Sequence, residues 1–194
     1  MNKNVKNVII KAAIQLIEQR GSNLDSITIR DICEAAHVGT GLVNYHFQSK
    51  DKLIENCVQI IIGDVINKTD LVYKGLEGKT PEEKLRIMAK YTCGFLAENE
   101  NISRISILTD MSSTFANDNT LQTVKAFLPI VKEVCYGKSD EDIKEKTYFL
   151  TLSLQGLFLR SRKLKEEMDF DFFNKGQRDK MVDKIIDLII KNGV

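Results

Sequence analysis

The sequence has 194 residues, which is enough for one large domain or for a small domain joined to a larger one. Hydrophobic residues make up 43% and charged residues 28%, as in an ordinary soluble globular protein. No run approaches the roughly 18 apolar residues that a membrane span requires, so no membrane partner is expected. The formal net charge is +1, so any binding to nucleic acid must depend on the placement of a few groups.

The four cysteines are scattered along the chain, and no two have the spacing of metal ligands. We interpret them as reduced core thiols of a cytoplasmic protein and not as a disulfide framework. The first residues pass directly into a helical pattern instead of a signal peptide. The sequence contains no phosphate-binding glycine loop, metal-ligand cluster or recognisable nucleophile, and so predicts no catalytic residue, metal or cofactor.

Apolar residues at helical spacing predict a first helix that includes Val5 and Ile17 and is stopped by Gly21. A second helix should begin at Thr28, whose side chain can cap it, with Asp31 near the positive end of the helix dipole. The buried face of this second helix would consist of Ile29, Ile32, Cys33 and Ala36.

The stretch 38–50, VGTGLVNYHFQSK, follows after a short break. On a helical wheel, Val43 and Phe47 share one face, whereas small and polar side chains occupy the opposite face. The outward side chains are Gly41, Asn44, Tyr45 and Gln48. Two short helices joined by a tight turn, the second with an exposed polar face, are typical of a helix-turn-helix motif that enters the major groove. A plain helical hairpin with a solvated face is the alternative.

The remainder of the chain also predicts helices. Ser49 should cap the next one, and a polar, glycine-containing stretch after about Tyr73 predicts a hinge. The segment TPEEKL, from Thr80, has a capping threonine, a proline at the first helical position and a glutamate three residues after the cap. Further helices are expected at 81–96, 101–115, 120–136, 140–162 and 177–191, with Pro129 kinking or dividing its helix. Without strand-like alternation, the prediction is an all-α fold of about nine helices.

The segment TIRDICEAAHVGTGLVNYHFQSKDKL, residues 28–53, resembles the DNA-binding segment of the tetracycline-repressor (TetR) family of bacterial regulators. The resemblance implies a helix-turn-helix domain at 1–50 with its motif at 28–47, a connecting helix at 51–74, and a helical effector-binding and dimerisation domain at 75–194. Three residues depart from the family pattern: His37 replaces the turn glycine, Gly39 the usual capping serine, and Asn44 a frequent tyrosine. These changes affect which DNA sequence the protein is expected to read, and not the expectation that it binds DNA.

Carried over by position, the DNA contacts would be Thr28, Arg30, Thr40, Gly41, Asn44, Tyr45, His46 and Lys50. Asn44 is the expected base contact, while Tyr45 and Lys50 would hold phosphates. His46 would either contact a phosphate or make a structural hydrogen bond to a neighbouring helix. Arg30 would either reach the DNA or pair at the surface with an acidic neighbour, Asp31 or Glu34.

The segment 148–159 is apolar nearly all round, as expected for a helix buried between its own domain and a partner subunit. Together with 181–190 it would form the four-helix interface of a homodimer on a palindromic, double-stranded operator. The interface residues would be Leu152, Gly156, Leu159, Met181, Ile185, Leu188 and Ile189. A monomeric core is the alternative.

Aromatic and methionine residues in the C-terminal part suggest a mostly apolar pocket, although they would also suit a solid core. The expected lining is Met88, Tyr91, Phe95, Met111, Phe115, Phe127 and Tyr148, with Thr92 and Gln155 as polar anchors. We therefore expect a ligand-responsive transcriptional regulator, a repressor released from its operator by a small apolar or aromatic effector. The alternative is a helical small-molecule-binding or interaction protein without DNA-binding activity.

Overall fold

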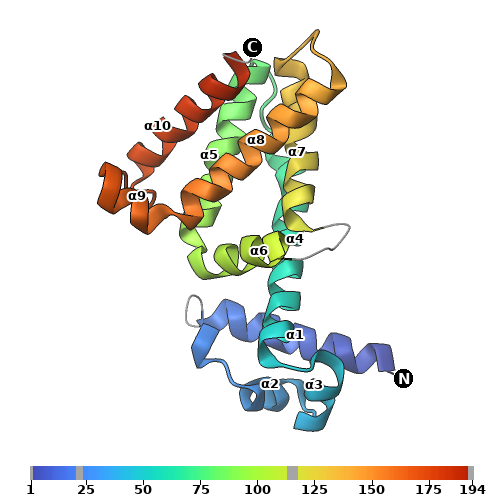
Figure 1. The fold of residues 1–194 in the computed structure, drawn as a ribbon. Helices are drawn as coiled ribbons and strands as arrows, with labels where there is room; N and C mark the ends of the chain where they lie inside the picture. Colours follow the sequence, from blue (N-terminus) through green and yellow to red (C-terminus); the bar gives the residue numbers. More distant parts are fainter. Residues whose placement is uncertain (1, 21–23, 113–117, 192–194) are drawn as a thin grey trace. The chain divides into compact units, whose positions relative to one another are not determined.

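A computed structural model describes residues 2–20, 24–112 and 118–191 of the chain. Ten α-helices and no strand occur within these residues, so the all-α prediction is confirmed (Figure 1). The helices are α1 (Asn2–Arg20), α2 (Ile29–Ala36), α3 (Thr40–Phe47), α4 (Lys50–Lys74), α5 (Pro81–Glu98), α6 (Glu100–Ser112), α7 (Asn119–Val134), α8 (Asp140–Leu159), α9 (Ser161–Met168) and α10 (Lys175–Ile186). A 3₁₀ turn (Leu24–Ser26) precedes α2 and a π-helical turn (Asp187–Lys191) follows α10.

The tenth helix is α9, which the sequence analysis did not predict: the helix expected at 140–162 corresponds to α8, and α9 begins at Ser161. The α8 helix ends at Leu159, and Arg160, with φ −93° and ψ 6°, separates it from α9. Pro129 lies inside α7, which continues to Val134, so the proline does not divide its helix. No described helix is long and apolar enough to cross a membrane.

The described residues group into two compact units. The first contains residues within 1–64 and 99–114, and the second contains residues within 65–98 and 115–194. The α6 helix therefore groups with the N-terminal residues, and within this unit Gln59 Nε2 of α4 donates to Asp110 Oδ1 of α6 at 2.8 Å. The functional boundaries at 50 and 74 stay a prediction.

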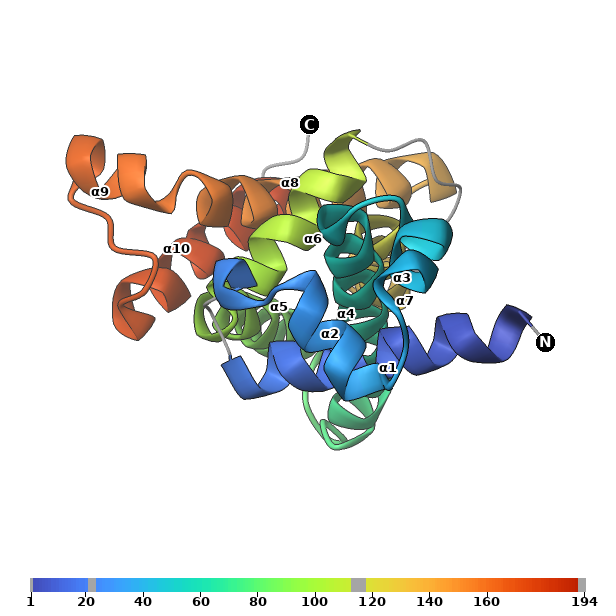
Figure 2. The same cartoon turned by 90° about the horizontal axis from the view of Figure 1, so that it is seen from below.

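In the first unit, α1 packs against both α2 and α3 (Figure 2). The core of the first unit consists of side chains with no exposed surface, namely Ile9, Ala13, Ile17, Ile27, Ile32, Leu53, Cys57 and Val58. Ile29, which was expected in the buried face of α2, is only half-buried. The predicted stop at Gly21 lies outside the described residues. The packing of α1 on α2 and α3 fixes which face of each short helix points outward.

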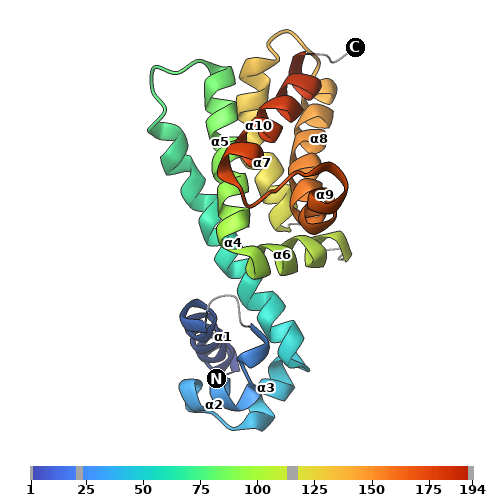
Figure 3. The same cartoon turned by 90° about the vertical axis from the view of Figure 1, so that its left-hand side faces the viewer.

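In the second unit, α7 packs against α5 and α8, and α10 lies between α5 and α8 (Figure 3). Ion pairs join α10 to α5: Arg86 reaches Asp183 at 3.0 Å and Asp187 at 2.5 Å, and Lys90 Nζ lies 2.8 Å from Asp183. The largest fully buried side chains of this unit are Leu85, Ile130, Leu150, Leu154, Phe158, Phe172 and Ile186.

Candidate DNA-binding interface

The start of α2 is fixed by a reciprocal cap. Asp31 N donates to Thr28 Oγ1 at 3.1 Å, and Thr28 N donates to Asp31 Oδ2 at 2.9 Å. Arg20 Nη1 of α1 also donates to Asp31 Oδ2, at 2.9 Å. Hydrogen bonds from the Thr28 backbone and side chain, and then from Arg20, hold the pKa of Asp31 below its usual value. The predicted cap is confirmed, and it ties the start of α2 to α1.

The turn between α2 and α3 depends on one left-handed residue. His37 adopts φ 53° and ψ 44°, and the next N–H, from Val38, donates to Cys33 O at 3.0 Å. Histidine therefore takes the backbone conformation that glycine adopts more readily. Gly39 is the N-cap of α3 and provides no side-chain hydrogen bond. The tight turn is thus preserved despite both departures from the family pattern.

The α3 helix has one buried and one exposed face. Val43 and Phe47 are buried, and Thr40, Gly41 and Asn44 are exposed. Tyr45 is 70% exposed, which is unusual for a large aromatic side chain. A methyl group added at Gly41 would meet no atom within 4 Å, so the helix surface is open there. The exposed amide, phenol and small residue lie where direct contact with another molecule is possible.

The end of α3 contains a feature that the sequence analysis missed. Gln48 is the C-cap, with φ 66°, and its N–H donates to Asn44 O at 2.9 Å. Its side-chain oxygen accepts from Lys52 Nζ at 2.6 Å, so this amide braces α4 instead of pointing freely outward. Ser49 Oγ accepts from Lys52 N at 3.2 Å, which confirms the predicted cap of α4. Lys50, the first residue of α4, is half-buried.

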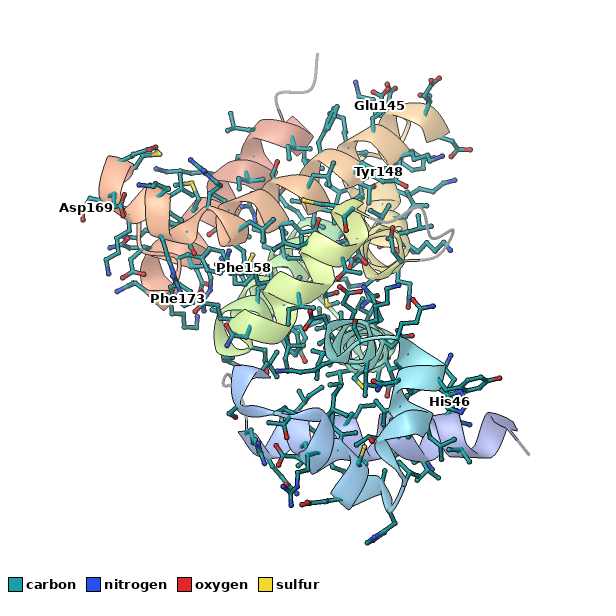
Figure 4. All side chains as sticks on the ribbon, turned by 60° about the horizontal axis from the view of Figure 1, so that its bottom comes forward. His46, Glu145, Tyr148, Phe158, Asp169 and Phe173 are labelled. Atoms are coloured by element: carbon teal, nitrogen blue, oxygen red, sulfur yellow. The ribbon has the colours of Figure 1, made fainter. Side chains whose placement is uncertain are left out.

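His46 and Arg30 had two possible roles each. His46, labelled in Figure 4, is half-buried, and its buried Nε2 has no hydrogen-bond partner in the described residues. The structural hydrogen bond considered for it is therefore not formed at this nitrogen. Arg30 Nε donates to Glu34 Oε1 at 2.9 Å, and both side chains are largely exposed. An exposed pair of this kind is weak, so it leaves Arg30 available to DNA.

The expected ligand-pocket residues differ in burial and come from both units. Met88 and Phe127 are buried, Thr92, Phe95 and Tyr148 are half-buried, and Tyr91 is exposed. Met111 is exposed on α6 and belongs to the first unit, whereas the other described candidates belong to the second. Phe115 lies outside the described residues.

The two expected polar anchors differ in what they offer a ligand. Thr92 Oγ1 donates to Met88 O at 3.0 Å, within its own helix. Gln155 Nε2 donates to Thr120 Oγ1 at 2.9 Å, while its buried Oε1 has no hydrogen-bond partner in the part of the chain that the structure describes. Gln155 is therefore the anchor with an unused polar atom.

The expected dimer residues lie along the outer sides of α8, α10 and the π-helical turn. Leu152 and Leu188 are exposed, whereas Gly156, Leu159, Met181, Ile185 and Ile189 are half-buried. Phe149, which was not among the expected interface residues, is 59% exposed on α8. A methyl group added at Gly156 would meet no atom within 4 Å. The described part of the chain therefore covers these apolar residues only in part.

Among the described residues, no group of three or more His, Cys, Asp or Glu side chains could hold a metal ion. The chemistry of the first unit is therefore that of hydrogen-bond donors and acceptors on an exposed helix. A capped short helix, a tight turn and a second helix with an outward polar face define a helix-turn-helix DNA-binding protein.

Comparison with known proteins shows which family the N-terminal part of the chain is similar to. Residues 9–57 match the family model of "Bacterial regulatory proteins, tetR family". The HTH-type transcriptional repressor KstR2 of Rhodococcus jostii is 27% identical over 141 residues, which cover 72% of this chain and 66% of that repressor. The match thus spans just under two thirds of the relative. Residues 9–57 are thus similar to the DNA-binding part of the TetR family, and the longer match to a repressor extends this similarity into the C-terminal part.

Solved structures share the fold over the whole chain. FadR from Bacillus subtilis, crystallised with stearoyl-CoA, has a TM-score of 0.59 and 16% identity, covering 96% of this chain and 98% of FadR. A TetR transcriptional regulator from Rhodococcus sp. RHA1 has a TM-score of 0.59 and 15% identity, covering 99% of this chain and 98% of that one. The similarity includes the C-terminal helices, beyond the part that the family model matches.

Proposed function

We propose that this protein is a homodimeric, ligand-responsive repressor that binds a palindromic operator and is released by a small molecule. The observation that carries the DNA-binding part is the two-sided α3 helix, whose Val43 and Phe47 are buried while Asn44 and Tyr45 face outward. A solvated hairpin has no need of an exposed tyrosine beside an exposed amide and a glycine. These residue types suit phosphate and base contacts in a major groove.

The second unit is the proposed effector-binding part. Gln155 supports this proposal because its unpaired, buried oxygen is an acceptor that a ligand donor would satisfy. Met88 and Phe127 supply buried apolar surface in the same unit. A mostly apolar site with a few polar groups is the usual composition of a small-molecule pocket. The stearoyl-CoA bound to FadR makes long-chain acyl compounds a sensible first panel.

The test is direct. The full-length protein is titrated, by fluorescence anisotropy, into a labelled fragment of the DNA upstream of its own gene and into a scrambled fragment, over a range of salt concentrations. We expect tighter binding to the cognate fragment and a steep decrease of affinity with salt. Equal, weak binding to both fragments would favour the alternative, a helical binding protein without DNA-binding activity.

A further inference from the structure

One buried cation in the second unit lacks a counterion. Arg178 of α10 is only 7% exposed, and no carboxylate of the described residues forms an ion pair with its guanidinium. The group is held from one side: Nη1 donates to Phe172 O at 3.0 Å, and the guanidinium carbon lies 5.8 Å from the centroid of the Phe172 ring. Burying a charge without a partner is strongly unfavourable, so the position requires an explanation.

The unused part of the guanidinium is a pair of adjacent donors. Nε is buried and has no hydrogen-bond partner among the described residues, and Nη2 lies on the same edge of the planar group. Two parallel N–H donors in this arrangement match the two oxygens of a carboxylate. The carbonyl of Phe172 holds Nη1, so it orients the group and leaves the Nε/Nη2 edge available.

Gly94 lies opposite this edge. It is inside α5, four residues before the end of the helix, and a methyl group added there would meet only Nη2 of Arg178, at 3.9 Å, among atoms beyond its own stretch of helix. Glycine inside a helix is less favourable than alanine, so helix stability does not explain the residue at this position. The side of α5 that lacks a side chain at Gly94 therefore faces the guanidinium of Arg178 where α5 packs against α10.

The surroundings favour an apolar molecule that carries the anion. Phe158 and Phe172 are fully buried with their ring centroids 5.6 Å apart, and Phe173 packs edge-on against Phe172. Figure 4 labels Phe158 and Phe173. The neighbouring Cys93 thiol cannot act as the counterion, because burial raises its pKa to about 12 although Arg178 acts to lower it. A free hydrated ion would lose its water here without gaining apolar contacts. An apolar carboxylate gains both the ionic interaction with Arg178 and apolar contacts with these rings.

We infer that the Nε/Nη2 edge of Arg178, beside Gly94, binds the carboxylate of an apolar small molecule. The inference rests on the proposed function in one respect, which is that this molecule is the effector. The carboxylate supplies the missing negative charge, and the apolar body replaces water beside the aromatic cluster of Phe158, Phe172 and Phe173.

The test compares three probes on the full-length protein by calorimetric titration. Dodecanoate, below its micellar concentration, should bind, and 1-dodecanol, with the same chain and no charge, should bind about 10- to 100-fold more weakly. Inorganic phosphate alone should show no binding at the same concentrations. Equal affinity for dodecanoate and dodecanol would overturn the inference, and binding of phosphate as tight as that of dodecanoate would overturn the assigned class of ligand.

Variants locate the site. Arg178→Met should fold, because an apolar side chain replaces an unpaired buried charge, and it should lose the preference for dodecanoate over dodecanol. Arg178→Lys keeps the charge without the two-donor edge and should bind dodecanoate more weakly than the parent. Lys180→Met removes a charge from the exposed side of the same helix and should leave binding unchanged. Unchanged dodecanoate binding by folded Arg178→Met would refute the site.

Gly94→Leu provides a second route that retains the guanidinium. Its side chain would lie against Nη2 and block the approach of a carboxylate, so dodecanoate binding should decrease while the helix remains intact. If Gly94→Leu binds dodecanoate like the parent, the edge of Arg178 beside Gly94 is not the site. Operator binding separates this inference from the proposed function: Arg178→Met should still bind operator DNA and fail to be released by dodecanoate. Failure of the parent protein to bind any DNA would refute the proposed function as a DNA-binding regulator, but it would not contradict the proposed carboxylate site.

Discussion

Asn44 has the position and chemistry of a base-reading residue. It is exposed on α3, and its backbone oxygen accepts from Gln48 N at 2.9 Å. We predict that Asn44→Ala loses about 1–3 kcal/mol on the cognate site and relaxes base preference at one position in each half-site. Binding to a panel of single-base operator variants measures this. Equal losses on cognate and random DNA would show that Asn44 does not read a base.

Lys50 should act on DNA without regard to sequence. It begins α4, where a lysine side chain and a helix N-terminus can both face a phosphate. Lys50→Ala should weaken binding to every sequence and lower the slope of log affinity against log salt by about 1. Lys144→Ala, an exposed lysine on α8 in the other unit, serves as the control. An unchanged slope in Lys50→Ala would exclude it from the phosphate contacts.

Single residues differ in how far their roles follow from sequence. The left-handed conformation of His37 could be expected, because the family motif requires it and histidine tolerates it. Gln48 could not, because an outward position on a wheel contains no information about a positive φ or about a bond to Lys52. The unpaired Nε of Arg178 depends on the fold around it, and an arginine in a polar helical segment gave no signal of burial.

At the scale of elements, the cap of α2 makes stability depend on pH. The folded-state pKa of Asp31 is below its usual value of 3.8, so its contribution to stability is present above that value and is lost as the pH falls through the folded pKa. We therefore predict that Asp31→Asn unfolds at a lower urea concentration than the parent at neutral pH. The difference between the two midpoints should shrink as the pH falls below 3.8. A difference independent of pH would show that the charge of Asp31 contributes nothing.

The exposed side of α8 allows a test of assembly. Gly156→Leu adds a bulky side chain where two subunits are proposed to meet, and the chain itself has room for it. Overpacking typically destabilises by about 1–3 kcal/mol, so the dimer should dissociate more readily and bind the operator more weakly. Sedimentation at micromolar concentration measures this, with Lys144→Leu on the same helix as control. A folded, fully dimeric Gly156→Leu protein would place the interface elsewhere.

Helix starts were more predictable than helix ends. Thr80 N donates to Glu83 Oε2 at 2.8 Å, and Ser139 Oγ accepts from Asp142 N at 3.1 Å, so local side chains define these N-termini. The end of α8 at Leu159 has no such marker, because Arg160 is neither glycine nor proline. The expected helix therefore ran three residues too far, to 162, and α9 was missed.

At the scale of the whole molecule, the fold class followed from apolar periodicity, whereas the grouping of helices did not. Periodicity depends on one helix at a time, so it identifies α6 but cannot tell which helices it packs against. Met111 illustrates the consequence: its residue type suggested a pocket with Tyr91 and Phe95, yet α6 groups with the first unit. The proposed effector site is for the same reason the least predictable part, since its lining would come from contacts between helices that are distant in sequence.

The last prediction concerns coupling between DNA and effector. If effector binding lowers operator affinity by some factor, the operator must lower effector affinity by the same factor, because both are equilibrium free energies of one cycle. Factors of roughly 5- to 150-fold are typical of such coupling. An effector found by thermal-shift screening, which must raise the melting temperature of the native protein, is titrated with and without saturating operator. A scrambled DNA fragment of equal length controls for charge. Unequal factors in the two directions would mean that the two measurements report different protein states, and an effector affinity unchanged by the operator would show that the ligand does not control DNA binding.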